Sequence, residues 1–241
     1  MTDIVYLVRP GNENPELRYS LRSVHRNMPH ERVWLFGHRP SFVSAAARHV
    51  FVPQRDPLRW KRQNALLILQ EIAARADIDR FVLFNDDFFV TQLTGPEPPP
   101  LHRGSLVELA RRRARINPSS HYTKVLDRTA RLLTDAGMPD ALSYETHSPM
   151  TMTRDQLSRT LAYIERHAAG KMVAPRSILG NVHHLGGELT GEIKVYGPEP
   201  SPSSGPFLST TDSSFKYHAV GKVIRRAFPD PSPYEQGGPS R

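Results

Sequence analysis

The first 93 residues alternate between segments with the apolar pattern of β-strands and segments with that of helices. The expected strands cover residues 4–8, 32–36, 49–52 and a run that ends at Asp86, and the expected helices cover residues 16–27 and 58–76. This alternation is typical of parallel strands covered by helices. We therefore predict an α/β fold with a mostly parallel sheet and flanking helices.

Proline and glycine interrupt this pattern at residues 94–104, which we expect to form a linker or an active-site loop. Helix-compatible patterns follow at residues 105–115, 122–136 and 154–168, the last preceded by Thr153 as a possible N-cap. A second run rich in Pro and Ser covers residues 197–206. We expect residues 1–93 to form an α/β half, residues 105–235 a more helical and mixed half, and residues 236–241 a disordered tail.

The charge and the cysteine content narrow the classes of function. The chain has 32 Lys and Arg against 24 Asp and Glu, a formal net charge of +8, which favours anionic partners such as nucleotides, nucleic acid or acidic polysaccharide. It has no cysteine, which excludes disulfides, thiolate-bound zinc and a thiol nucleophile. The N-terminus enters a strand pattern without a basic and apolar leader, and no apolar run could span a membrane, so we expect a cytoplasmic protein.

The fourth expected strand runs directly into Asn85, Asp86 and Asp87. Ligands of open α/β sheets bind at the carboxyl ends of the strands. Adjacent carboxylates repel each other unless a cation or a proton neutralises them, and their oxygens suit Mg²⁺ or Mn²⁺ that also holds a phosphate. Asn-Asp-Asp is equally ordinary turn chemistry, so the spacing alone leaves a metal site and a solvated turn open.

Other residues are candidates for the same chemistry. His147 precedes a Ser-Pro pair and could accept a proton near neutral pH. Arg18 lies near the start of an expected helix, where anions are favoured, Arg176 could clamp a diphosphate, and Asp212 could complete a metal shell. Each of these residues also has an ordinary explanation. At the start of the helix, Glu16 already complements the helix dipole, and the other residues could form helix caps or surface ion pairs.

Two further observations restrict the function. Arg111, Arg112, Arg113 and Arg115 could contact phosphates, but no aromatic residues alternate with them, so a solvated helix face is the simpler interpretation. The chain contains no Gly-x-Gly-x-x-Gly, no Walker-type loop and no Gly-x-Ser-x-Gly. Nicotinamide, P-loop and serine-hydrolase chemistry therefore have no support.

Several motifs follow one another in a specific order. They are Asp3-Ile-Val-Tyr6 with Gly11, Glu16-Leu-Arg-Tyr-Ser-Leu-Arg-Ser23, Phe84-Asn-Asp-Asp87, His147-Ser-Pro149 with Arg176-Ser177, and Asp212 with Phe228-Pro-Asp-Pro-Ser-Pro-Tyr-Glu235. In this order they resemble the Stealth family of sugar-phosphate transferases, which includes bacterial capsule-polymer phosphotransferases and the animal enzyme that adds N-acetylglucosamine-1-phosphate to lysosomal glycans. The chain departs from the family pattern at Pro10, where the family has Asp, and at Val8-Arg9, where it has Trp-Val. It also lacks the long insertions of some members.

The resemblance implies a fold like that of metal-dependent GT-A-type glycosyltransferases and a nucleotide-diphosphosugar donor. It implies that Mg²⁺ or Mn²⁺ is bound by Asp86 or Asp87 together with Asp212. It further implies that Arg18, Asn85 and Arg176 bind the donor, and that His147, Glu16 and Asp87 are catalytic. The expected reaction transfers a sugar 1-phosphate to the hydroxyl of a glycan, a protein or a modified nucleic acid.

Two other functions remain open from the sequence. A strand that ends in acidic residues is also how metal-dependent glycosyltransferases hold their metal, so the sugar itself could be the transferred group. The basic excess is compatible with a non-catalytic accessory protein that binds nucleic acid on a transferase scaffold.

Overall fold

A computed structural model describes residues 2–55, 61–198 and 205–239, and it divides into two compact units. The sheet unit comprises the described parts of residues 1–98, 147–152 and 192–241, and the helical unit comprises residues 99–146 and 153–191. This division differs from the expected one at residues 94–104, because residues 192–239 belong with the N-terminal sheet. The reason is a second, small sheet that joins the two ends of the chain.

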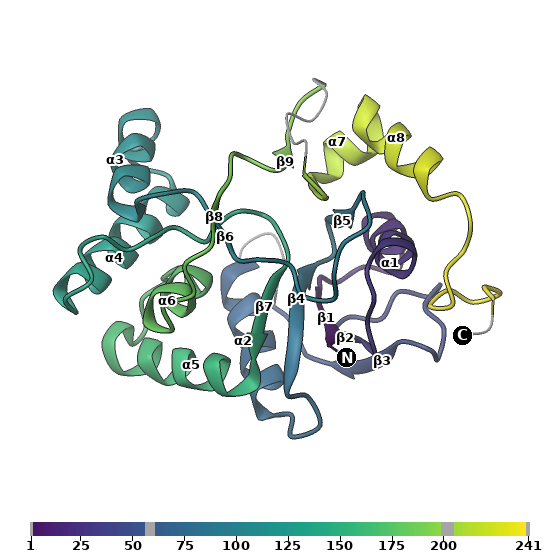
Figure 1. Cartoon of the computed structure of the whole chain (residues 1–241), viewed down its shortest axis with the longest axis horizontal. Helices are drawn as coiled ribbons and strands as arrows, with labels where there is room; N and C mark the ends of the chain where they lie inside the picture. The colour runs from purple at the N-terminus through teal and green to yellow at the C-terminus, as the bar shows by residue number, and fades with distance from the viewer. Residues whose placement is uncertain (1, 56–60, 199–204, 240–241) are drawn as a thin grey trace. The chain divides into compact units, whose positions relative to one another are not determined.

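The sheet unit contains most of the strands (Figure 1). Its strands are β1 (Asp3–Val8), β2 (Val33–Gly37), β3 (Arg48–Phe51), β4 (Arg80–Asn85), β5 (Phe88–Val90), β7 (Met150–Thr153), β9 (Lys194–Val195) and β10 (Phe207–Thr210). Its helices are α1 (Pro15–Asn27), α2 (Lys61–Ala74), α7 (Asp212–Tyr217) and α8 (Ala219–Ala227).

The central sheet has the strand order β3-β2-β1-β4-β7. β1 pairs in parallel with both β2 and β4, and β2 pairs in parallel with β3, which confirms the expected mostly parallel sheet. The chain builds outward from β1 through β2 to β3, and β4 then returns to the other side of β1. β1 and β4 therefore flank a topological switch point, and the register pairs Leu7 with Asn85 near their carboxyl ends.

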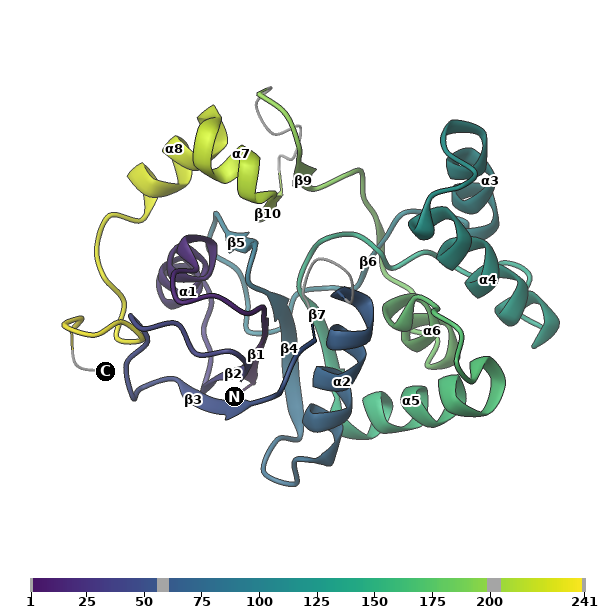
Figure 2. The ribbon, with the colours of Figure 1, turned by 180° about the vertical axis from the view of Figure 1, so that it is seen from behind.

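The two helices of this α/β region are close to those expected. α1 begins with Pro15 after Asn14, whose side chain caps the helix by accepting from the amide of Leu17. α2 covers Lys61–Ala74, and the expected start at residues 58–60 lies outside the described residues. Figures 1 and 2 both show β1 and β4 between α1 and α2. This is expected for right-handed crossovers, because α1 connects β1 to β2 and α2 connects β3 to β4 in the opposite direction across the sheet.

The second sheet has the order β5-β10-β9, and its strands are labelled in Figure 2. β10 pairs antiparallel with β5, which follows β4 directly, and parallel with β9. An apolar cluster supports this sheet, formed by Phe89, Val195, Leu208, Phe215, Val220, Ile224 and Phe228. Burial of these side chains holds the C-terminal residues against the N-terminal part of the chain.

The helical unit contains α3 (Leu106–Ile116), α4 (His121–Asp135), α5 (Arg154–Ala168), α6 (Pro175–Val182) and the short strands β6 (Leu101–His102) and β8 (Glu188–Leu189). α3, α4 and α5 confirm the helices expected at residues 105–115, 122–136 and 154–168. Thr153 forms a capping box with Gln156 at the start of α5. The C-terminal half is mixed, because residues 192–239 add the strands β9 and β10 as well as the helices α7 and α8.

The C-terminal end is held by hydrogen bonds as far as Gly238. In the expected disordered tail, the amide of Gln236 donates to the carbonyl of Phe42, and the amide of Gly238 donates to Glu235. Residues 240–241 lie outside the described part of the chain. Within the described part, no helix has both the length and the apolar character needed to cross a membrane.

Candidate functional site

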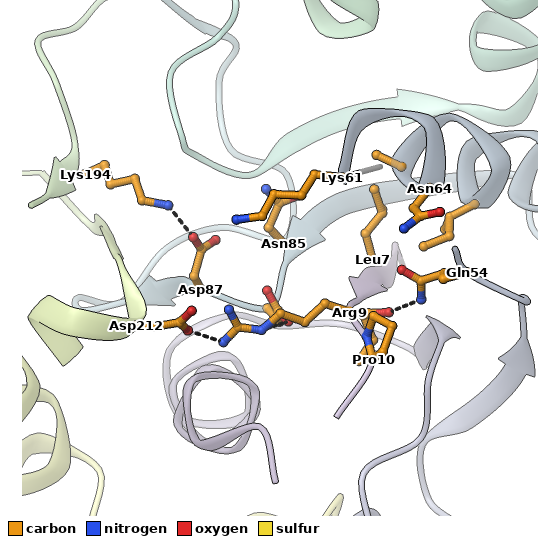
Figure 3. Close-up of a pocket in the computed structure, with 14 residues that line it drawn as sticks. Leu7, Arg9, Pro10, Gln54, Lys61, Asn64, Asn85, Asp87, Lys194 and Asp212 are labelled. Carbon is orange, nitrogen blue, oxygen red and sulfur yellow. Dashed lines mark hydrogen bonds and ion pairs between the residues drawn. The ribbon is translucent and has the colours of Figure 1, made fainter. Parts of the chain in front are cut away.

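A pocket of about 510 Å³ opens at the carboxyl ends of β1 and β4, at the switch point of the central sheet (Figure 3). Its polar lining residues are Arg9, Gln54, Lys61, Asn64, Asn85, Asp86, Asp87, Lys194 and Asp212. The strand ends supply Arg9 and the Asn-Asp-Asp segment. β9 supplies Lys194 and the start of α7 supplies Asp212, so the second sheet and the helix that follows it complete the site.

Arg9 joins three of the carboxylates in this region. Its Nη2 atom lies 2.7 Å from Oε2 of Glu16 and 2.5 Å from Oδ1 of Asp212, and its Nε atom lies 3.3 Å from Oδ2 of Asp86. Burial alone would lower the pKa of Arg9, but Asp86, Asp212 and Glu16 raise it, so the guanidinium stays charged. Arg9 is therefore a permanent cation shared by Glu16, Asp86 and Asp212, three residues that the sequence motifs also grouped.

Asp87 has a different partner. Its Oδ2 atom lies 2.5 Å from Nζ of Lys194, and both side chains are largely buried. Burial opposes the charge on Lys194, but Asp87 more than compensates and raises the pKa of Lys194. The other oxygen of Asp87, Oδ1, is buried without a hydrogen-bond partner among the residues that the structure describes. A buried carboxylate oxygen without a donor is costly, which makes Oδ1 of Asp87 a candidate contact for a ligand.

Glu16 carries a strongly perturbed carboxyl group. It is buried at the first turn of α1, and the hydroxyl of Thr210 donates to its Oε1 at 2.5 Å. Burial, a hydrogen bond with Asp212 and the charge of Asp87 raise the pKa of Glu16 to about 8, against the opposing effect of Arg9. Glu16 is therefore mostly protonated at pH 7.

Asp86 and Asp212 differ in their electrostatic surroundings. Burial and the neighbouring charge of Asp87 raise the pKa of Asp86, although Arg9 and the 2.6 Å hydrogen bond from Asn14 oppose them. Burial would also raise the pKa of Asp212, but the hydrogen bonds with Glu16 and Arg9 lower it. The proton shared by Glu16 and Asp212 thus belongs mainly to Glu16.

Cations and acidic groups occur together in and beside the pocket. The cations are Arg9, Lys194 and Lys61, and the acidic residues are Asp86, Asp87 and Asp212, with Glu16 next to them. Lys61, at the start of α2, lines the pocket, and its charge contributes to the lowered pKa of Asp212. A diphosphate that entered here would lie close to carboxyl groups as well as to cations, which favours entry together with a divalent cation.

The proposed metal ligands Asp86, Asp87 and Asp212 have different partners in the structure. Among the described residues, no group of three or more His, Asp or Glu side chains is arranged to hold a metal ion by itself. Asp86 and Asp212 contact Arg9, whereas Asp87 has the unsatisfied oxygen. Mg²⁺ in phosphate-transfer sites is often bound by one or two carboxylates plus the phosphates of the substrate, and Asp87 fits that role best.

Arg18 does not line the pocket. Its guanidinium packs on the ring of Phe42, 4.4 Å from the ring centroid, and its Nε atom lies 3.8 Å from Oε2 of Glu235. A helix places residues two apart on different sides, so Glu16 and Arg18 cannot both face the same ligand. Arg176, the second residue of α6, belongs to the helical unit.

The motif of residues 16–23 has a structural role beyond Glu16. The hydroxyl of Ser20 donates to the carbonyl of Phe88, and Ser23 accepts from the amide of Val90, which fixes α1 to β5. The Nε and Nη2 atoms of Arg22 each lie 2.8 Å from an oxygen of Glu235. Two motifs from opposite ends of the chain are therefore bonded to each other.

His147 belongs to the sheet unit, and its ring contacts Glu192 and Tyr196, which flank the lysine that reaches Asp87. The sequence reasoning missed Arg9, Lys61 and Lys194, which line the pocket, and Glu192, which contacts His147. Arg9 could have been found, because it follows β1 just as Asp86 follows β4. Lys194 and Glu192 lie outside any motif and carried no such signal.

Comparison with known proteins adds no identification: no protein-family model matches the chain, and no curated protein matches its sequence.

Proposed function

We propose that the protein transfers a sugar 1-phosphate from a nucleotide-diphosphosugar to an acceptor hydroxyl. The observation that carries this proposal is the pocket at the switch point, where carboxylates from three segments and three cationic side chains lie in or beside one cavity. Such positions in α/β sheets bind nucleotides. The ordered motifs that resemble the Stealth family support the same reaction, and we further propose that the fold is a variant of the GT-A type.

In this proposal the residues of the pocket bind the donor diphosphate. Lys61 and Arg9 supply positive charge, Asn85 supplies hydrogen bonds, and Asp87 holds Mg²⁺ or Mn²⁺ through its unsatisfied oxygen. The ion, when bound, would neutralise charge on the phosphates. Positioning and electrostatic stabilisation are the main contributions of a protein to phosphoryl transfer. Arg176 stays a proposed donor contact, to be tested by substitution.

The bond changes of the proposed step are those of an ordinary displacement. The acceptor oxygen forms a bond to the phosphorus on the sugar side, and the bond from that phosphorus to the bridging oxygen breaks. The nucleoside monophosphate leaves with the electron pair, and the acceptor proton passes to a base. Glu16 is mostly protonated at pH 7, so His147 is the better candidate for that base. Glu16 and Asp212 instead contact the guanidinium of Arg9.

A thermal-shift screen of nucleotide sugars with and without Mg²⁺ or Mn²⁺ tests donor binding. We expect one donor to raise the melting temperature only when the metal is present, and Asp87→Asn to abolish that increase. Glu71→Gln, on the exposed surface of α2, is the matched control and should behave like the wild type. Failure of every nucleotide sugar to stabilise the wild-type protein would overturn the proposal.

Analysis of the spent donor separates two reactions. Sugar-phosphate transfer releases a nucleoside monophosphate, whereas a glycosyltransferase would release a nucleoside diphosphate. The carboxylates at the end of β4 are compatible with both reactions. Mass spectrometry of the products decides between them.

The charge of the helical unit supports a second candidate function, binding of a polyanion. This unit has 13 Lys and Arg against 8 Asp and Glu. It is the smaller of the two units, yet it carries more than half of the net positive charge of the chain. The arginines at positions 111–113 and 115 lie on α3. Salt-sensitive DNA binding without any nucleotide-sugar binding would favour the accessory-protein function.

A further inference from the structure

His147 has an unusual backbone conformation. Its φ angle is 55°, in the left-handed region that few residues other than glycine adopt. Such a conformation is costly and persists where the surrounding structure holds it, often at functional sites. The surrounding structure therefore holds the backbone at His147 in this conformation.

One neighbour is the carboxyl group of Glu192. Nδ1 of His147 lies 3.0 Å from Oε1 of Glu192. An ionised carboxylate only accepts hydrogen bonds, so Nδ1 carries the hydrogen and Nε2 keeps its lone pair. The amide of Lys194 also donates to Oε1 of Glu192, at 3.2 Å, which fixes the orientation of the carboxylate.

Glu192, Lys194 and Tyr196 lie at alternate positions along the extended segment that contains β9. Alternate residues of a strand share a face and are about 7 Å apart. Lys194 contacts Asp87 in the pocket, while the ring of Tyr196 meets that of His147 edge-on, with the ring centroids 6.5 Å apart. The short segment of residues 192–196 therefore contacts both His147 and the carboxylate proposed to hold the metal, although only Lys194 and Val195 of it form β9.

We propose that Glu192 is a positioning residue that holds His147 with Nε2 free to accept the proton of the acceptor hydroxyl. This inference rests on the proposed function, because it concerns the base of the same transfer step. The O–H bond of the acceptor breaks, its proton moves to Nε2, and His147 becomes an imidazolium paired with Glu192. The arrangement follows the general pattern of a base oriented by a third group.

A merely structural pair would have a different effect. The contact could serve only to tie the segment of residues 147–152 to the small sheet. Removing Glu192 would then lower the stability of the protein without changing the hydrogen position on His147 or the rate of transfer at saturating donor.

The first test measures the tautomer of His147 in long-range ¹H–¹⁵N NMR spectra of the full chain at pH 8, with His147→Gln to assign the signals. We expect the Nδ1–H form in the wild type and in Glu71→Gln, and a shift towards the Nε2–H form in Glu192→Ala. This measurement requires no donor. A wild-type protein with mainly the Nε2–H form, or a Glu192→Ala protein with an unchanged tautomer, would overturn the inference.

The second test measures transfer once a donor is identified. Glu192→Ala should reduce kcat on the order of 10- to 100-fold with little change in the KM for the donor, because a lost base contribution affects the chemical step. Glu192→Asp, which keeps a carboxylate, should recover part of kcat. An unchanged kcat in a folded Glu192→Ala protein refutes the positioning role. A wild-type protein with the expected tautomer but no transfer refutes both the role and the proposed function, whereas failure of the tautomer test alone leaves the proposed function standing.

Discussion

The Nη2 atom of Arg9 lies 2.5 Å from Oδ1 of Asp212, although the two residues are near opposite ends of the chain. The same nitrogen also contacts Glu16. Arg9 lies at the end of β1, and Asp212 begins α7 after β10, so the contact closes the pocket on the side of the second sheet. Glu16, Asp86 and Asp212 are thus assembled around a cation that belongs to the protein, whereas Asp87 pairs with Lys194.

Replacing Arg9 with methionine should destabilise the protein by about 1 to 3 kcal/mol. The change removes the charge that contacts Glu16, Asp86 and Asp212, and it leaves the buried carboxyl group of Asp86 without this cation. The partial exposure of Arg9 and Asp212 keeps the loss below that of a fully buried pair. Urea denaturation measures the free energy of unfolding. Arg80→Met, which breaks the exposed pair with Glu97, is the control and should cost less than about 1 kcal/mol. Equal losses in the two variants would contradict the central role of Arg9.

Glu16 should make the protein less stable as the pH rises from 5 to 8. Its pKa is about 8 in the folded protein, above the ordinary glutamate value of 4.5, so the folded state binds more protons in this window than the unfolded state does. Stability falls with pH wherever the folded state binds the extra proton, at up to about 1.4 kcal/mol per pH unit for one group. Glu16→Gln removes this titration, and its stability should depend less on pH. Denaturation curves at several pH values check this, and parallel pH profiles for the two proteins would show that Glu16 ionises normally.

Asp87→Asn should weaken divalent-metal binding more than Asp212→Asn. Oδ1 of Asp87 is the unsatisfied buried carboxylate oxygen in the pocket among the described residues, whereas the contacting oxygen of Asp212 already faces Arg9. Titration of Mn²⁺ in the presence of a nucleoside diphosphate, followed by electron paramagnetic resonance, gives the fraction of bound metal. We expect an affinity weaker by about 10-fold or more for Asp87→Asn, because a carboxylate ligand is lost. A greater loss for Asp212→Asn would move the proposed metal ligand to α7.

The contact between Arg22 and Glu235 should stabilise the fold without taking part in catalysis. Arg22 binds both oxygens of Glu235 and also donates to the carbonyls of Phe228 and Pro229. Arg22→Lys cannot reproduce this geometry, and we expect it to cost about 1 to 3 kcal/mol. Arg26→Lys, which affects one exposed bond to Ala227, should cost much less. Unfolding by urea measures both, and a loss of donor binding in a stable Arg22→Lys protein would instead place Arg22 in the site.

Local patterns in the sequence predicted much of the sheet unit. The strand that ends at Asn85, the helix after Pro15 and the Thr153 cap are found close to where they were expected. These features depend on neighbouring residues, such as apolar periodicity and a capping side chain, and so can be read from short segments. The boundary between the two units could not be predicted from short segments, because the pairing of β5 with β10 joins segments far apart in the chain.

By itself, the sequence determined an α/β sheet with Asn85, Asp86 and Asp87 at a strand end, and it grouped Glu16 and Asp212 with them through the order of the motifs. Only the tertiary structure decided which atoms meet: Arg9 with Glu16, Asp86 and Asp212, Lys194 with Asp87, and Arg18 with Glu235 instead of the pocket. The physical reason is that a charged group is neutralised by whichever partner the folded backbone brings within a few ångströms. That distance depends on strand order and register, which the spacing of residues along the chain does not contain.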